Sequence, residues 1–199
     1  MITGIIMASG FSKRMNKDKL TLNLGGMPVI ERVIKAAKQS ILDEIIIVYQ
    51  KDSIRNIAQG YCIKTVFNSS PEKGQSESMK LGIKASKPNT DAYMFIVGDQ
   101  PLLNSKTINT LINIFSKNHS EILVPIYNGE KGSPTIFSSV LKEKLLKTEG
   151  DKGGRNIIQS MPGKTKYVNI EDFKVGLDID TWEEYQQLIE MEMGKQWMK

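Results

Sequence analysis

The stretch ITGIIMASGFSKRMNKDK, from Ile2 to Lys19, decides the fold. Its apolar first half is typical of a buried strand, and its second half is a loop that begins at Ser9 and Gly10 and carries Arg14. Small residues and glycine let backbone N–H groups approach an anion closely and form a nest around it. Arginine grips phosphate through two N–H groups, and lysine adds a mobile point charge. The pattern favours an exposed phosphate-binding loop, with a tight turn between solvated cations as the alternative.

Apolar runs alternate with helical patterns along the chain. The expected strands cover residues 2–8, 43–50, 63–68, 92–99, 121–127 and 165–170. The expected helices cover residues 28–40, 53–59, 76–86, 105–118, 138–147, 153–161 and 181–193. Such alternation predicts crossover units and a mostly parallel sheet with helices on both faces. We therefore predict a single three-layer α/β/α domain over residues 1–199, with a Rossmann-like sheet.

The composition is that of an ordinary globular protein in a reducing compartment. The chain has 199 residues, 40% hydrophobic and 25% charged, which suffices for one packed domain. No apolar run reaches the roughly 20 residues that span a bilayer, so no membrane partner is expected. Cys62 is the only cysteine, which favours the cytoplasm, and we expect it to be a small apolar filler beside a strand. His119, the only histidine, is expected at the polar end of a helix.

The positive charge does not indicate a nucleic-acid partner. The formal net charge is +5, but the lysines are scattered and no basic run or aromatic-and-basic patch occurs. Dispersed cations suit an anionic small molecule better.

Asp99 ends the fourth expected strand, in the segment VGDQP. Ligands of open parallel sheets bind beyond the carboxyl ends of the strands, and neighbouring strands lie roughly 5 Å apart. If the first and fourth strands are neighbours, the Asp99 carboxylate faces the phosphate loop. Mg2+ would then relieve the repulsion, because it binds through one or two carboxylates plus substrate phosphates. A cap on the following turn is the alternative.

A second acidic segment, GLDIDTWEE, precedes the last helix. Asp178 and Asp180 alternate on an extended stretch and should face the same side. Thr181 and Glu184 have the spacing of a capping box. The aspartates are therefore either metal ligands or favourable charges at a helix N-terminus.

Two further loops are rich in glycine and small polar residues. PEKGQSESMKLG, residues 71–82, suits hydrogen bonding to a base or a ribose, and GDKGGR, residues 150–155, opens a helix with an arginine. Ordinary helix capping is the alternative for both.

Taken in order, six segments resemble the molybdenum cofactor cytidylyltransferase family. They are IIMASGFSKRMNKDKLTLNLGGMPVIERV, GQSESMKLG, VGDQPLL, PIYNGEKGSPTIF, GDKGGR and LDIDTWEEY. The resemblance runs from Ile2 to about Glu184. That family belongs to the nucleotidyltransferases related to nucleotide-diphospho-sugar transferases, with a glycosyltransferase A-like fold. The order of six motifs is far more specific than any one of them.

The resemblance implies a role for each matching residue. Catalytic roles fall on Lys19, Arg14 and Asp99, and metal-binding roles on Asp99, Asp178 and Asp180. Nucleotide-binding roles fall on Ala8, Ser9, Gly10, Arg14, Lys19, Gly74, Gln75, Ser76 and Ser78. Acceptor-binding roles fall on Gly132, Pro134, Asp151 and Arg155. Ser9 replaces an alanine of the family; a buried unpaired hydroxyl costs roughly 1–3 kcal/mol, so it should bond to the base, the ribose or a neighbouring loop group.

The implied reaction is a Mg2+-dependent transfer of a nucleoside monophosphate to the phosphate of molybdopterin, with or without molybdenum. CTP is the expected donor and GTP a possible one, and pyrophosphate leaves. A molybdenum hydroxylase apoenzyme is a further expected partner. The alternatives are a same-fold cytidylyltransferase for a sugar phosphate or methylerythritol phosphate, and a non-catalytic accessory protein for molybdenum hydroxylase maturation.

Overall fold

The computed structural model describes residues 1–11, 15, 17–118 and 120–197. Eight strands form the main sheet: β1 Ile2–Ala8, β4 Glu44–Tyr49, β5 Lys64–Phe67, β6 Ala92–Val97, β7 Ile122–Tyr127, β8 Glu130–Lys131, β9 Thr135–Ser138 and β10 Thr165–Ile170. The α-helices are α1 Val29–Lys38, α2 Asp52–Gln59, α3 Gln75–Ala85, α4 Ser105–Lys117, α5 Lys142–Leu146, α6 Arg155–Ser160 and α7 Trp182–Trp197. Short 3-10 helices are η1 Lys19–Thr21, η2 Pro71–Lys73, η3 Ser139–Leu141, η4 Gly150–Lys152, η5 Pro162–Lys164 and η6 Phe173–Gly176. Each expected strand and helix is present, although α5 and α6 are shorter than expected.

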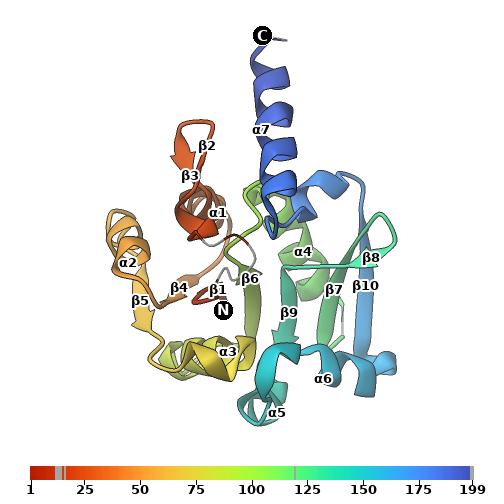
Figure 1. Ribbon diagram of the computed structural model, residues 1–199. Helices are drawn as coiled ribbons and strands as arrows, with labels where there is room; N and C mark the ends of the chain where they lie inside the picture. Colours follow the sequence, from red (N-terminus) through yellow and green to blue (C-terminus); the bar gives the residue numbers. More distant parts are fainter. Residues whose placement is uncertain (12–14, 16, 119, 198–199) are drawn as a thin grey trace.

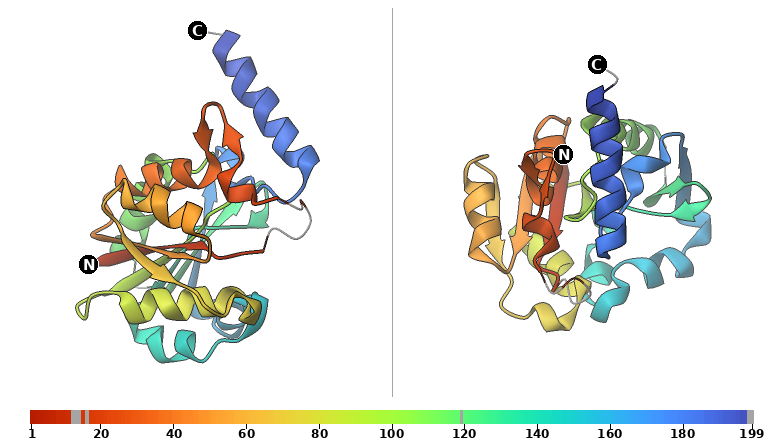
Figure 2. Two further views of the ribbon diagram at one scale, coloured as in Figure 1. Left: turned by 60° about the vertical axis from the view of Figure 1, so that its left-hand side comes forward. Right: turned by 45° about the horizontal axis from the view of Figure 1, so that its top comes forward.

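The sheet is covered on both faces, as Figures 1 and 2 show. Helices α1, α2 and α4 lie on one face, and α3, α5 and α6 on the other. Successive strand residues point to opposite faces, so Ile6 and Ile47 join one apolar cluster while Ile5 and Val48 join the other. All four side chains are fully buried. The predicted three-layer α/β/α arrangement is confirmed.

The strand order, β10-β7-β9-β6-β1-β4-β5 with β8 beside β7, is mostly parallel. Strand β1 pairs in parallel with β4 and with β6, which confirms that the first and fourth expected strands are neighbours. Strand β9, which lies antiparallel between β6 and β7, is not among the expected strands. It has only four residues, and Ile136 and Phe137 are adjacent and buried on opposite faces, so the pattern lacks the alternation of a half-exposed strand.

Helix α7 extends away from the sheet beside a small hairpin (Figure 1). The hairpin pairs β2, Asn23–Leu24, with β3, Met27–Pro28, across two glycines with positive φ. Arg32 of α1 forms an ion pair of 2.8 Å with Glu192, and the Tyr185 hydroxyl donates to the carbonyl of Asn23. These contacts tie the last helix to the segment that follows the first loop.

Two minor expectations have different outcomes. Cys62 is exposed and has a φ of 52°, so the prediction that it is a small apolar filler on or beside a strand is wrong. It lies in the turn after α2, where the chain reverses before β5. The expectation for His119 falls outside the described residues. Within the described ranges, no helix is both long enough and apolar enough to cross a membrane.

Replacing Gly82 with alanine should destabilise the fold. A Cβ at this position of α3 would lie 2.3 Å from Cγ2 of Ile5, a fully buried and β-branched side chain in β1. Overpacking of this kind costs roughly 1–3 kcal/mol, more than the 0.5–1 kcal/mol that alanine gains over glycine in a helix. Gly194→Ala in α7, where the added Cβ meets no atom within 4 Å, is the control. Urea denaturation should show a loss only for Gly82→Ala, and equal midpoints would contradict this packing.

Candidate active site

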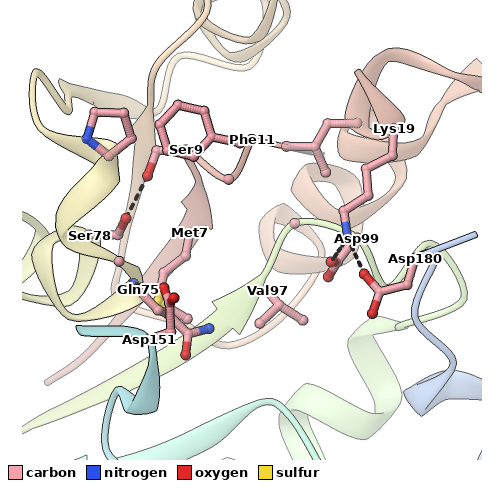
Figure 3. A pocket seen from close by; sticks show the side chains of 15 residues that line it. Met7, Ser9, Phe11, Lys19, Gln75, Ser78, Val97, Asp99, Asp151 and Asp180 are labelled. Atoms are coloured by element: carbon pink, nitrogen blue, oxygen red, sulfur yellow. Dashed lines mark hydrogen bonds and ion pairs between the residues drawn. The ribbon is translucent and has the colours of Figure 1, made fainter. Parts of the chain in front are cut away.

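A cavity of about 380 Å³ lies at the carboxyl ends of β1 and β6 (Figure 3). It is lined by Met7, Ser9, Gly10, Phe11, Lys19, Leu20, Pro71, Gly74, Gln75, Ser78, Val97, Gly98, Asp99, Asp151 and Asp180. Figure 3 shows two polar groups on opposite sides of it: the hydroxyls of Ser9 and Ser78, and the charged cluster of Lys19, Asp99 and Asp180. The strand ends therefore bring together residues more than 160 positions apart.

Lys19 bridges the two carboxylates of the charged cluster. Its Nζ lies 2.5 Å from Oδ2 of Asp99 and 2.8 Å from Oδ1 of Asp180. Burial alone lowers the pKa of Lys19, but the charge of Asp99 and hydrogen bonds to both carboxylates outweigh it, so the pKa is raised. The ammonium is therefore held in its charged form. The expectation that Lys19 lies in an exposed loop is wrong, because it begins η1 and its side chain is only 13% exposed.

The segment before α7 holds Asp180 in place. Glu184 accepts hydrogen bonds from the backbone N–H groups of Asp180 and Thr181, and the Thr181 hydroxyl accepts one from the N–H of Glu184. The predicted capping box is thus confirmed. Because the capping box pairs the first backbone N–H groups of the helix, the Asp180 side chain is not needed as a cap and points at Lys19.

Asp178 has a different environment from Asp180. Its Oδ1 accepts a hydrogen bond of 2.6 Å from the side-chain amide of Gln100, which is 2% exposed. Burial, followed by repulsion from Asp99, raises the pKa of Asp178 to about 6, although the Gln100 bond acts in the opposite direction. Asp178 lines a second cavity rather than the first. Asp180 therefore lines the first cavity, whereas Asp178 lines the second.

The residues around Lys19 could hold a divalent cation through two carboxylates. Oδ1 of Asp99 is buried and has no hydrogen-bond partner among the described residues. A buried carboxylate oxygen of this kind fits the role of a cation ligand. Asp180 faces the same ammonium from the other side. Within those residues, however, no group of three or more histidine, cysteine or acidic side chains is arranged around one point. The predicted set of Asp99, Asp178 and Asp180 is therefore not assembled as a ready-made site.

Gly74 brings the two polar loops together. It has a φ of 84°, and a Cβ there would lie 2.5 Å from Oδ1 of Asp151 and from the backbone of Gly150, so only glycine fits. The backbone N–H of Gln75 donates to Asp151 at 3.3 Å. Asp151, expected on the acceptor side, thus lies in the wall of the first cavity.

The other predicted nucleotide-binding residues divide into lining and supporting ones. Ser9, Gly10, Lys19, Gly74, Gln75 and Ser78 line the cavity, whereas Ala8 and Ser76 are buried and do not. Arg14 lies outside the described residues. Ala8 and Ser76 can therefore act only by shaping the backbone around the ligand.

The second cavity, of about 870 Å³, adjoins the first. Met7, Gln75 and Val97 line both. Gly132 and Arg155, predicted on the acceptor side, line the second cavity together with Tyr127, Asp178 and Phe173. Pro134, whose peptide bond with Ser133 is cis, does not line it. Two ligands bound in these cavities would meet beside Met7 and Val97.

Three residues near the cavities were not singled out from the sequence. Asn68 follows β5 and hydrogen-bonds to Ser9, and Gln100 holds Asp178. The hydroxyl of Tyr127 donates a hydrogen bond of 2.8 Å to the carbonyl of Ser133. Burial raises the pKa of Tyr127 above its usual value. Asn68 and Gln100 did carry a signal, because each is a polar residue at the carboxyl end of an expected strand.

The chain is similar to proteins of known sequence and structure. Residues 4–166 match the model of the MobA-like NTP transferase domain. The chain is 28% identical to the purine catabolism protein PucB of Bacillus subtilis, over 92% of this chain and 94% of that protein. It is 31% identical to the "Probable molybdenum cofactor guanylyltransferase" of Thermococcus gammatolerans, over 71% and 74%. Among solved structures, Rv0371c from Mycobacterium tuberculosis has a TM-score of 0.84 and 25% identity over 95% and 97% of the two chains, and a complex of Rv0371c with manganese is also known.

Lys19→Ala should lower the free energy of unfolding by roughly 1–3 kcal/mol. Breaking a fully buried ion pair costs about 3–5 kcal/mol, and the loss is smaller here because the Asp180 side chain is 34% exposed and can be hydrated. Lys164→Ala, which removes an ion pair of 2.8 Å between more exposed side chains, should cost less than about 1 kcal/mol. Guanidinium denaturation of both variants measures the difference. Equal losses would mean that the Lys19 bridge contributes no more than a surface pair.

Proposed function

The chain belongs to the MobA-like NTP transferase family, and we propose that it transfers CMP from CTP to the terminal phosphate of molybdopterin, releasing pyrophosphate. The acceptor carries molybdenum or not. Residues 1–199 act as a single nucleotidyltransferase domain in the cytoplasm. The observation that carries the proposal is the charged cluster of Lys19, Asp99 and Asp180 in the first cavity, which adjoins a second cavity.

The reaction needs positioning and charge neutralisation more than acid–base groups. The attacking oxygen belongs to a phosphate and is already anionic, so no general base is required. The chain contains only one histidine, which agrees with such a mechanism. Phosphoryl-group transfers of this kind are accelerated mainly by alignment of the reactants and by cations near the developing charge. The first cavity would hold the triphosphate and the second the acceptor.

Lys19 and a divalent cation would supply the positive charge. Asp99 and Asp180 would hold Mg2+, and the cation would neutralise the triphosphate when it is bound. The unpartnered Oδ1 of Asp99 supports this role. Lys19 would orient the phosphates, and Arg14 is proposed to act beside it from the loop. Asp178, which faces the second cavity, fits the acceptor better than the metal.

CTP is proposed as the donor on the basis of Ser9. Several relatives are named as guanylyltransferases, and the resemblance of the Ala8-Ser9-Gly10 turn is instead to the cytidylyl branch. A serine side chain leaves less room beside the loop than a glycine would, which disfavours the larger guanine ring. The Ser9 hydroxyl already bonds to Ser78 at 2.6 Å, so of the three expected partners the neighbouring group is the one supported.

Molybdopterin is proposed as the acceptor because the second cavity is large and partly apolar. Phe95, Val124 and Phe173 line it together with Arg155 and Gln159, a mixture that suits a fused ring bearing a phosphate. A sugar phosphate or methylerythritol phosphate offers little apolar surface to such walls. The product would pass to a molybdenum hydroxylase apoenzyme, and a purely accessory role is the remaining alternative.

A triphosphate panel tests the proposed function directly. The purified protein is incubated with CTP, GTP, ATP or UTP, with Mg2+ and with molybdopterin, a sugar phosphate or methylerythritol phosphate, and pyrophosphate release is measured. We expect release with CTP and molybdopterin at a specificity constant well above every other pair. Pyrophosphate release with another acceptor would show that molybdopterin is not the substrate. If no pair of triphosphate and acceptor releases pyrophosphate, the accessory role is the alternative that remains.

Asp99→Asn should abolish turnover while preserving the fold. The change is nearly isosteric but removes the charge that faces both Lys19 and the proposed Mg2+. Loss of one transition-state contact typically costs about 10²–10³ in rate, and we expect a loss of at least that size in pyrophosphate release. In electron paramagnetic resonance, binding to the wild type should broaden the Mn2+ signal. The Asp99→Asn variant should leave that signal unchanged.

Asp172→Asn is the matched control for this substitution. Asp172 is exposed and caps η6 through a bond from the N–H of Lys174, which asparagine can also accept. This variant should keep both the rate and the broadening of the Mn2+ signal. If Asp99→Asn retains more than about a tenth of the wild-type rate, the proposed metal role is wrong.

A further inference from the structure

Three buried polar side chains form a closed network on the side of the first cavity opposite Lys19. The hydroxyls of Ser9 and Ser78 lie 2.6 Å apart, and the side-chain amide nitrogen of Asn68 lies 3.0 Å from Oγ of Ser9 and 3.5 Å from Oγ of Ser78. The exposed fractions are 5% for Ser9, 3% for Ser78 and 0% for Asn68. Both serines line the cavity, whereas Asn68 lies behind them. Asn68 can thus affect a ligand only through the serines.

The orientation of the Asn68 amide is fixed by its other end. Its Oδ1 accepts a hydrogen bond of 2.9 Å from the backbone N–H of Ser70. A backbone N–H can only donate, so the atom that faces it must be the amide oxygen. The backbone N–H of Asn68 donates to the carbonyl of Tyr49 at 2.7 Å. The oxygen of the amide therefore faces Ser70, and the NH2 group faces the serine pair. Asn68 can donate to the pair but cannot accept from it.

Counting hydrogens then gives the polarity that the pair presents to a ligand. Two serines carry two hydroxyl hydrogens, and the bond between them uses one. Because Asn68 cannot accept the second hydroxyl hydrogen, that hydrogen remains available for a ligand, whichever of the two serines donates to the other. None of the hydrogen bonds among the described residues uses it. The cavity wall therefore offers one O–H donor at this point.

We propose that Asn68 is a positioning residue for base selection, which fixes the Ser9–Ser78 pair as a donor and so selects a base that presents an acceptor. This inference rests on the proposed function and deepens it, because it names what the pair recognises. Cytosine offers two neighbouring acceptors, N3 and O2, on its pairing edge. On its pairing edge guanine offers only one acceptor, O6, beside two donors, N1–H and the N2 amino group, and these donors would meet the hydroxyl hydrogen unfavourably.

Asn68→Asp reverses this polarity without changing the shape of the network. A carboxylate keeps an oxygen for the N–H of Ser70, but its second oxygen accepts where the amide donated. One serine hydrogen then goes to the carboxylate and the other to the partner serine, so the cavity wall presents only lone pairs. The ratio of CTP affinity to GTP affinity should fall by about tenfold, the effect of one to two neutral hydrogen bonds.

The experiment is a calorimetric titration with CTP and with GTP, in the absence of any acceptor. The new negative charge weakens both triphosphates alike and cancels in the ratio. Asn104→Asp is the matched control, because Asn104 caps α4 through a bond to Thr107 and lies on the surface. It should leave the ratio unchanged. An unchanged ratio in Asn68→Asp, or a wild type that prefers GTP, would overturn the inference.

Modified nucleotides test the same point on the wild-type protein, so the result does not depend on whether the variant folds. In 3-deaza-CTP the N3 acceptor becomes C–H, and in 2-thio-CTP the O2 acceptor becomes a weakly accepting sulfur. One of the two should bind about tenfold more weakly than CTP. If both bind like CTP, the inference is wrong. A protein that prefers CTP, responds to Asn68→Asp and yet transfers nothing to molybdopterin would refute the proposed function and leave this inference standing.

Discussion

The ammonium of Lys19 joins three distant parts of the chain at one point. It extends from η1, meets Asp99 at the end of β6 and meets Asp180 just before α7. Two carboxylates this close would repel each other in a largely buried site, so a cation between them is needed for the strand ends and the last helix to approach. The Arg32–Glu192 ion pair and the Tyr185–Asn23 hydrogen bond reinforce the same connection farther out along α7.

The order of the strands turns this contact into a site. Because β1 lies between β6 and β4, Ser9, directly after β1, lines the same cavity as Asp99 on one side and bonds to Asn68 on the other. Antiparallel β9 separates β6 from β7 and makes room for the second cavity beyond β6. The cluster of Lys19, Asp99 and Asp180 therefore lies toward β6, and the hydroxyls of Ser9 and Ser78 lie toward β4 and β5. This division follows from topology, since any residue after a given strand has a fixed place along the edge.

Much of this was predictable from the sequence, and the exceptions have physical reasons. The apolar runs located each parallel strand, and the spacing of Thr181 and Glu184 gave the capping box. Strand β9 was missed because four residues carry no clear period. Lys19 was misplaced in an exposed loop because a charged residue gives no local sign of burial when both of its partners lie at least 80 positions away. The role of Asn68 was missed for a related reason, because its partner Ser9 is 59 positions away along the chain.

The separation of charged and neutral groups bears on how readily base preference can change. In the proposed function the charged cluster would contact the phosphates, which every nucleoside triphosphate shares, so it would contribute to affinity without distinguishing one base from another. Discrimination is then left to the neutral side, where each hydrogen bond is worth only about 0.5–1.5 kcal/mol. A single exchange there can alter selectivity about tenfold without disturbing the sheet or the Lys19 bridge. A site of this kind is compatible with relatives of 25–31% identity that are named for guanylyl transfer, because the fold and the phosphate contacts would not distinguish one base from another.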